Sequence, residues 1–298
     1  MNIKNVTFFA SYIALSIAFV SCGSSTDTAD DETIDTASAD TKVKDVKAQN
    51  VFYSIPSPIE TTTLLKAAGA KYNAKYLNPI ENVSNYSSVA SKALNLGVYG
   101  SDLSFTSIFD QTQESMLYLR CTNKLATGLG ISGAFDETTT SRIESNMQNR
   151  DSLLAIISDS YWNADSYLKE NGQPGVSALI VAGGWIEGLY IATQIANATK
   201  NEAIVARIGE QKLSLENLIA LLDSYKGDNE GVAEVLNSMI ELKTIFDQIP
   251  VTAAETTATT DATKALTTLG NGSTFRLTPQ QLKQISDKSA EIRNKIIK

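Results

Sequence analysis

The residue types best suited to chemistry gather in one apolar stretch of the chain, LIVAGGWIEGLYIATQIA, which covers positions 179–196. It contains one carboxylate, Glu187, between the aromatic residues Trp185 and Tyr190. The upstream segment SDSYWNADSYL contains three more aromatic residues, of which Tyr161 and Trp162 are adjacent. A carboxylate buried away from water needs a charged partner or a raised pKa, and a raised pKa suits proton transfer or ligand binding. Aromatic side chains are typical of small-ligand sites. We therefore hypothesise a small-ligand or glycan pocket lined by Glu187, Trp185, Tyr190, Tyr161 and Trp162.

A structural interpretation of Glu187 stands beside the functional one. Arg120 flanks the apolar stripe of a helix predicted over 101–127, and it is the expected cation of a buried ion pair with Glu187. Structural ion pairs perturb pKa values just as catalytic ones do, so the pattern alone leaves both interpretations open.

A hydrolase that works through two carboxylates is a further alternative. Asp159 and Asp165 share one helical side with Trp162, and glycosidases combine paired carboxylates with aromatic platforms. Spacing along one helix does not establish the separation that such a reaction needs. An amphipathic helix with an exposed polar face gives the same pattern.

The rest of the composition excludes several classes of site. The chain of 298 residues contains no histidine, which excludes His-based triads and His metal ligands. Its two cysteines, Cys22 and Cys121, are too few for a zinc–cysteine cluster, and Cys121 lies in a helical pattern typical of a core thiol. Walker, GxSxG and GxGxxG motifs are lacking. We expect no catalytic residues, metal or cofactor, and the net charge of −8 disfavours nucleic acid as a partner.

The N-terminus, MNIKNVTFFASYIALSIAFVSCGSS, has the order of a secretory signal peptide, with basic Lys4 ahead of an apolar run over 6–20. The run ends in Phe-Val-Ser-Cys, with Cys22 last. This end resembles the bacterial lipobox and is similar to the looser lipoboxes of Bacteroidetes-type envelope lipoproteins, although Phe19 departs from the usual leucine. The resemblance implies a signal peptide over 1–21 and a lipid such as palmitate on Cys22 that holds the body at a membrane.

The segment 22–50 is rich in Ser, Thr and Asp and contains almost no large apolar residue. It cannot bury enough surface to offset its chain entropy, so we expect a disordered acidic tether. Gly23 stands where inner-membrane lipoproteins carry an aspartate, and this resemblance implies the outer membrane. The acidic cluster over 30–32 resembles surface-export signals but lies farther from the cysteine, so the periplasmic face and the cell surface both stay open.

Beyond position 50 the pattern is helical. Apolar residues recur every three or four positions, and Ser57-Pro58-Ile59-Glu60 has the form of a capping box. The Thr/Ala-rich segment 251–277 predicts a long loop with room for a short helix ending at Gly270. We expect helices over about 58–69, 82–97, 101–127, 137–148, 151–172, 174–196, 202–225, 230–248 and 278–298. They predict one all-α domain over 51–298, built as a bundle or as stacked antiparallel hairpins.

The helix over 174–196 is apolar on every side, so it is either buried in protein or in a membrane. Gly184 and Gly188 form a GxxxG pattern, which also occurs in membrane helix pairs. Glu187 would be costly in a bilayer, the flanks lack basic anchors, and the neighbouring helices are amphipathic. We therefore expect the central helix of the bundle, with the two glycines allowing another helix to approach closely.

Together these patterns predict a lipid-anchored protein of the cell envelope with a non-enzymatic binding or scaffolding role. Its expected contacts are the membrane, through Cys22, and an envelope protein whose identity the pattern does not specify. The alternative is a protein that binds a small ligand or glycan, or a carboxylate hydrolase, at the pocket hypothesised around Glu187.

Overall fold

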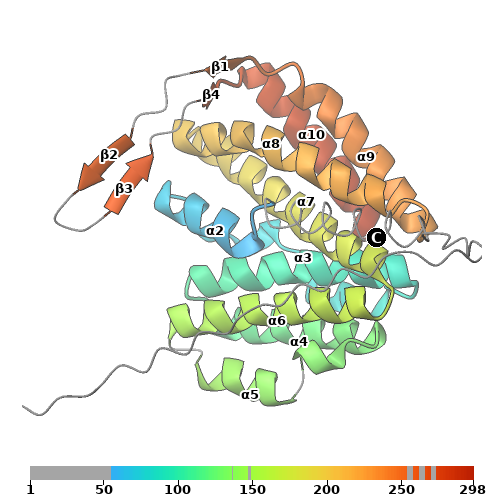
Figure 1. Cartoon of the computed structure of the whole chain (residues 1–298). Coiled ribbons are helices and arrows are strands. Elements are labelled where there is room, and N and C mark those ends of the chain that lie inside the picture. The colour runs from blue at the N-terminus through green and yellow to red at the C-terminus, as the bar shows by residue number, and fades with distance from the viewer. Residues whose placement is uncertain (1–54, 136, 147–148, 254–257, 262–265, 270–272) are drawn as a thin grey trace, which may run out of the picture.

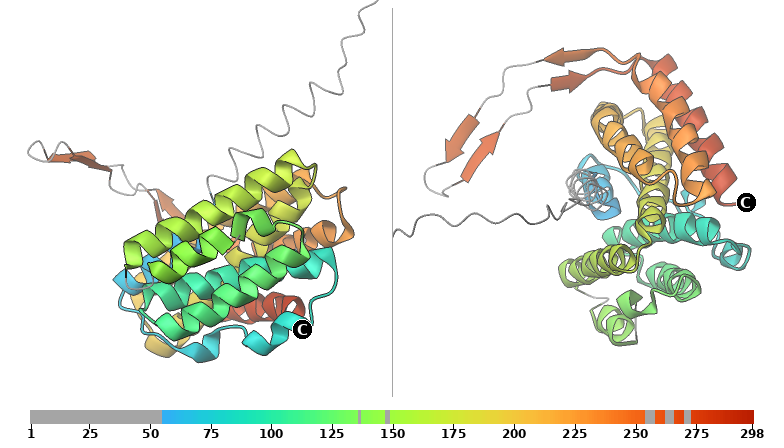
Figure 2. Two further views of the ribbon diagram at one scale, coloured as in Figure 1. Left: turned by 90° about the horizontal axis from the view of Figure 1, so that it is seen from below. Right: turned by 45° about the vertical axis from the view of Figure 1, so that its right-hand side comes forward.

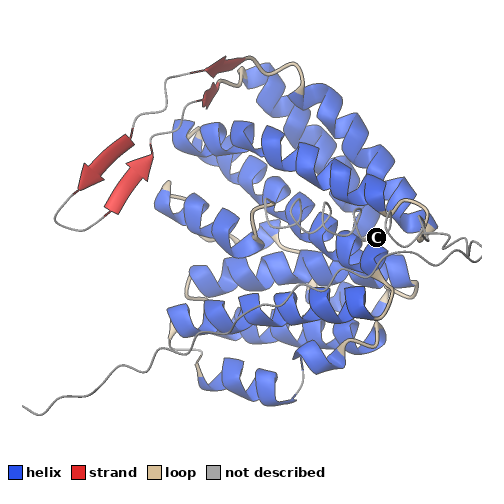
Figure 3. Cartoon of the chain, in the orientation of Figure 1, coloured by secondary structure: helices blue, strands red, loops and turns tan. Residues whose placement is uncertain are grey.

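The computed structural model describes residues 55–135, 137–146, 149–253, 258–261, 266–269 and 273–298 of the chain. The predictions of a signal peptide over 1–21, a lipidated Cys22 and a tether over 22–50 lie outside these residues. Helices dominate the described residues, as the blue ribbons of Figure 3 show, and this confirms the predicted all-α class.

The first and last described helices begin at the predicted caps. At the start of α2 (Pro58–Ala67), the Ser57 hydroxyl accepts from the Glu60 N–H while the Glu60 carboxylate accepts from the Ser57 N–H. Thr278 caps α10 (Pro279–Ile296) in the same way. The helices between them are α3 (Val89–Ile108), α4 (Thr112–Gly128), α5 (Glu137–Ser145), α6 (Arg150–Glu170), α7 (Pro174–Thr199), α8 (Glu202–Ser224) and α9 (Glu230–Phe246), and the short 3₁₀ turns are η1 (Ala74–Tyr76), η2 (Ile80–Ser84) and η3 (Ser132–Phe135).

α7 is the central helix, as predicted. In Figure 1 it runs between a group formed by α8, α9 and α10 and a second group formed by α3, α4, α5 and α6, and Figure 2 shows the same division. Among the described residues α7 is the one helix long and apolar enough to cross a membrane, but 89% of its most apolar 18-residue window is buried inside the bundle. Its all-round apolar surface is therefore used as core.

Glycines bring α3 and α7 unusually close together. A Cβ atom on Gly97 would overlap the Ile180 carbonyl oxygen, and one on Gly183 would overlap the Leu94 carbonyl oxygen. Of the predicted contact glycines, Gly184 belongs to this contact, since a Cβ atom on it would lie 3.3 Å from the Gly97 carbonyl oxygen and 3.2 Å from Pro58 of α2, whereas Gly188 lies nearest Thr61 of α2, at 3.4 Å. The predicted close approach thus exists, and its tightest points are at Gly97 and Gly183.

The boundary between the third and fourth helices differs from the prediction. We expected one helix to stop at Gly97 and the next to span 101–127, but α3 continues through Gly97 to Ile108. The break falls instead at Asp110, whose φ of 60° is left-handed and ends the helix. Gly97 suggested a helix stop, whereas its lack of a side chain serves helix packing.

The predicted loop over 251–277 contains short strands. β1 (Val251–Ala253) pairs antiparallel with β4 (Ser273–Phe275), and β2 (Ala258–Asp261) pairs antiparallel with β3 (Leu266–Leu269). In the second ladder threonines face threonines in register, and β-branched side chains favour extended backbone. The short helix expected to end at Gly270 is therefore wrong, because the residues before Gly270 form β3.

Candidate functional site

Glu187 is one half of a buried, bidentate ion pair. Its Oε2 accepts from Nε of Arg293 at 2.7 Å and its Oε1 accepts from Nη2 at 2.8 Å. The Glu187 side chain is 0% exposed and the Arg293 side chain is 7% exposed. The predicted partner, Arg120, is wrong, because it lies exposed on α4 while α10 supplies the cation.

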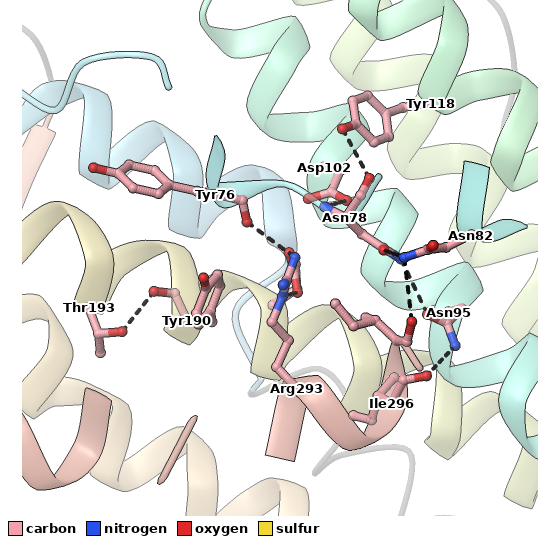
Figure 4. Close-up of polar contacts among 12 residues, drawn as sticks. Tyr76, Asn78, Asn82, Asn95, Asp102, Tyr118, Tyr190, Thr193, Arg293 and Ile296 are labelled. Atoms are coloured by element: carbon pink, nitrogen blue, oxygen red, sulfur yellow. Dashed lines mark hydrogen bonds and ion pairs between the residues drawn. The ribbon is translucent and has the colours of Figure 1, made fainter. Parts of the chain in front are cut away.

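Two further groups hold the Arg293 guanidinium in place, as Figure 4 shows. Nη2 also donates to the Tyr76 carbonyl oxygen in η1 at 3.2 Å. The Tyr190 ring, one turn beyond Glu187 on α7, lies with its centroid 4.3 Å from the guanidinium carbon. Both charge compensation and a cation–π contact therefore fix this arginine inside the bundle.

A second carboxyl group, Asp102 on α3, belongs to the same cluster. Its Oδ2 accepts from the Asn78 N–H at 3.1 Å, while its Oδ1 has no hydrogen-bond partner among the described residues. Burial first, and the negative charge of Glu187 second, raise the Asp102 pKa well above its usual value, against the lowering effect of Arg293. One guanidinium cannot neutralise two buried carboxylates, so the raised pKa favours the protonated form of Asp102, whose hydroxyl is a donor.

The polar cluster extends to the C-terminal turn of α10. Asn95 donates to the Ile296 carbonyl oxygen at 2.8 Å, and the Tyr86 hydroxyl donates to the Ile297 carbonyl oxygen at 3.3 Å. Carbonyl groups at a helix C-terminus lack partners within the helix, and here the side chains of Asn95 and Tyr86 supply the missing donors. The cluster therefore docks α10 onto α3 and α7.

A cavity of about 460 Å³ lies on another side of α7, between α2, α3, α6 and α7. Three of the five predicted pocket residues line it, Tyr161, Trp162 and Trp185, whereas Glu187 and Tyr190 do not. Two positions along an α-helix are about 200° apart, so Trp185 and Glu187 point to opposite sides. The structure thus separates the predicted pocket into an aromatic cavity and a buried ion pair.

Most polar groups in the cavity wall are already bonded within the protein. The Tyr161 hydroxyl donates to the Leu96 carbonyl oxygen at 3.1 Å, and Trp185 Nε1 donates to Ser214 Oγ at 3.0 Å. Ser177 Oγ donates to Oδ1 of Asp165, and Lys169 Nζ donates to its Oδ2 at 2.7 Å. The wall therefore offers a ligand mainly apolar surface.

The remaining chemical candidates lie apart from one another. Cys121 is buried in the core, where burial first raises the pKa of its thiol to about 11. The Cys121 thiol is therefore a poor nucleophile at neutral pH.

The two aspartates of the hypothesised hydrolase site are also separated. Asp159 is exposed on α6, whereas Asp165 is buried against Ser177, so the two do not form one carboxylate pair in the cavity wall.

The fold and the site define an all-α bundle with an ion pair in its core and an aromatic cavity beside its central helix. Comparisons of the chain with protein-family models, with curated proteins and with solved structures found no match.

Reasoning from sequence missed Arg293 and the burial of Asp102. Arg293 interrupts the apolar stripe of α10, in which Leu282, Ile285 and Ile292 are buried, and a cation on an apolar face signals a buried counter-charge. Asp102 lies among residues that are buried on every side of α3, and a helix end predicted at Gly97 hid this pattern.

Proposed function

We propose that this protein is a lipid-anchored, non-enzymatic binding protein of the cell envelope, and that a small ligand binds in the cavity between α2, α3, α6 and α7. The observation that carries the proposal is the cavity itself. Its volume of about 460 Å³ falls in the range of about 300–1,000 Å³ that is usual for small-molecule sites. Tyr161, Trp162 and Trp185 supply aromatic walls of the kind that such sites use.

The anchoring part of the proposal rests on the N-terminal sequence. A basic residue, an apolar run and a cysteine after a small residue have the order of a lipoprotein signal, and Cys22 is the proposed acylation site. We place the body at the outer membrane, on its periplasmic face or at the cell surface. An acidic tether over 22–50 would let the body reach a partner in the envelope.

The geometry disfavours a hydrolysis in which Glu187 is the acting carboxylate. Glu187 has both oxygens engaged by Arg293 and does not line the cavity. A general acid or base must lie within hydrogen-bond reach of its substrate, and Glu187 lacks such access. Its role is therefore to hold the bundle together, while the cavity serves the ligand.

Ligand binding is tested with N-phenyl-1-naphthylamine, an uncharged apolar fluorophore whose emission rises in apolar pockets. Val181 lines the cavity, so Val181→Phe fills part of it and weakens probe binding by at least about tenfold. Val205 on α8 is also half-buried but lies outside the cavity, so Val205→Phe is the matched control and leaves binding unchanged. Equal probe binding by the wild type and Val181→Phe, with both folded by circular dichroism, would refute the cavity as a ligand site.

Anchoring is tested separately in cells fed an alkyne-labelled palmitate. The wild-type chain takes up the label and sediments with the membrane fraction, whereas Cys22→Ser does neither. Cys121→Ser is the matched control, because it removes a thiol from the buried core rather than from the proposed lipidation site. Label on the Cys22→Ser chain, or an unlabelled wild type, contradicts the anchor.

A further inference from the structure

We infer that the cavity selects a single-chain amphiphile with an uncharged or positively charged headgroup and rejects anionic amphiphiles of equal chain length. This inference rests on the proposed function, because it names the class of ligand that the proposed cavity accepts. It follows from two properties of the wall, namely that most of its hydrogen-bonding groups are already bonded within the protein, and the sign of its charges.

The first property disfavours a sugar. A glycan loses many water contacts on entering a cavity and needs a hydrogen-bond partner for each hydroxyl group. Ser104 Oγ in the wall donates to the Gly100 carbonyl oxygen at 2.8 Å, and the hydroxyl groups of Tyr161 and Ser177 are likewise bonded within the protein. An apolar chain makes no such demand and gains from contact with Ile180, Leu154 and Trp185.

The second property is the sign of the wall's charge. The carboxylates that line the cavity are Glu60 and Asp165, and its described lining contains no lysine or arginine. Lys169 pairs with Asp165 from outside this lining, so Glu60 leaves the wall net negative. Like charges brought together in a partly desolvated site repel strongly, which disfavours an anionic headgroup.

The two carboxylates of the wall differ in exposure and in pairing. Asp165 is buried beside Ser177, whereas Glu60 is exposed at the first turn of α2. Because Lys169 pairs with Asp165, Glu60 is the carboxylate of the wall that has no ion pair among the described residues, and it is the charge that repels an anionic headgroup. Trp162, which is 38% exposed, adds an aromatic surface that tolerates a cation.

The experiment displaces bound N-phenyl-1-naphthylamine from the full-length chain carrying Cys22→Ser, which cannot be acylated. Decan-1-ol, decylammonium and decanoate are compared at neutral pH below their micelle-forming concentrations. We expect decanoate to need a concentration at least about tenfold higher than either of the others for half-displacement. Glu60→Gln combined with Asp165→Asn should narrow this difference to about threefold or less, because the wall then carries no carboxylate and Lys169 beside it loses its counter-charge.

Two controls keep the outcome interpretable. Glu234→Gln removes an exposed charge on α9, away from the cavity, and should leave the discrimination unchanged. Glu60→Gln alone keeps the capping box, since glutamine serves at that position too, and should narrow the difference in part even where the double variant does not fold.

The possible failures are distinguishable. If the probe binds in a manner that depends on Val181 but decanoate displaces it as well as decan-1-ol does, the selectivity is wrong and the proposed function stands. If probe binding does not depend on Val181, the proposed function and this inference both fail. If decanoate is rejected equally by the wild type and by the double variant, the two carboxylates are not the cause and the inference is overturned.

Discussion

Arg293 and Glu187 lie 106 positions apart in the chain, and their side chains form a two-pronged ion pair inside the bundle, with N–O distances of 2.7 and 2.8 Å. The pair joins the last helix to the central one. Because both groups are almost completely shielded from water, neither can lose its partner without leaving an uncompensated charge in the core. The docking of α10 therefore depends on this contact.

Removing either partner should destabilise the fold severely. We expect Arg293→Met and Glu187→Gln each to lower the free energy of unfolding by about 3–5 kcal/mol, since each leaves a buried charge unpaired. The double variant Glu187→Leu/Arg293→Met should lose less than the sum of the single changes, because it removes both charges. Urea titrations followed by far-UV circular dichroism measure these values.

The control for this prediction lies on the same helix. Lys283 and Asp287 form an exposed ion pair at 2.5 Å, and exposed pairs contribute little to stability. Lys283→Met should therefore shift the urea midpoint only slightly. A Glu187→Gln midpoint equal to that of the wild type would mean that Glu187 faces solvent.

Asp102 should make the stability depend on pH. The folded state holds the Asp102 proton at pH values where the unfolded chain, with an aspartate pKa of about 3.9, has released it. The folded state then binds more protons, so the free energy of unfolding falls as the pH rises above about 4 and through the raised pKa of the folded state. The stabilisation is complete only below the pKa of the unfolded chain. Because the chain contains no histidine, few other groups titrate between about pH 5 and 8.

Asp102→Asn tests this dependence directly. The amide stays neutral and still offers a donor toward Glu187, so the variant should gain stability over the wild type as the pH rises from about 5 to about 8. Urea midpoints from tryptophan fluorescence at several pH values measure the difference. Asp159→Asn changes an exposed aspartate on α6, and its urea midpoint should change with pH in the same way as that of the wild type. If the urea midpoints of Asp102→Asn and the wild type differ by the same amount at every pH in this range, Asp102 does not retain its proton in the folded state.

Much of the fold follows from local signals. The caps at Ser57 and Thr278 and the apolar periodicity of the later helices depend on neighbours within a few positions, and they predicted α2, α8, α9 and α10 well. Gly97 shows where such reasoning ends. A glycine suits a helix stop or a close helix contact equally well, and only the tertiary arrangement decides between them.

The same limit applies to the site. The sequence shows that Glu187 sits in an apolar helix, and burial with a cationic partner follows from that. Which cation meets it depends on how α10 returns to the bundle from across the 251–277 segment, and no local pattern encodes this return. Helix geometry alone places Trp185 and Glu187 about 200° apart around α7, so the sequence already indicated that they face different sites.

The contact between α3 and α7 yields the last prediction. Gly97→Ala places a Cβ atom on the Ile180 carbonyl oxygen, and neither backbone can move without disturbing the central helix. Overpacking of this kind should lower the free energy of unfolding by about 3 kcal/mol. Gly227→Ala is the matched control, because a Cβ atom there has no neighbour within 4 Å, and its effect should be small. Differential scanning calorimetry compares the two. If Gly97→Ala has the same melting temperature as the wild type, the two helices do not approach as closely as their glycines allow.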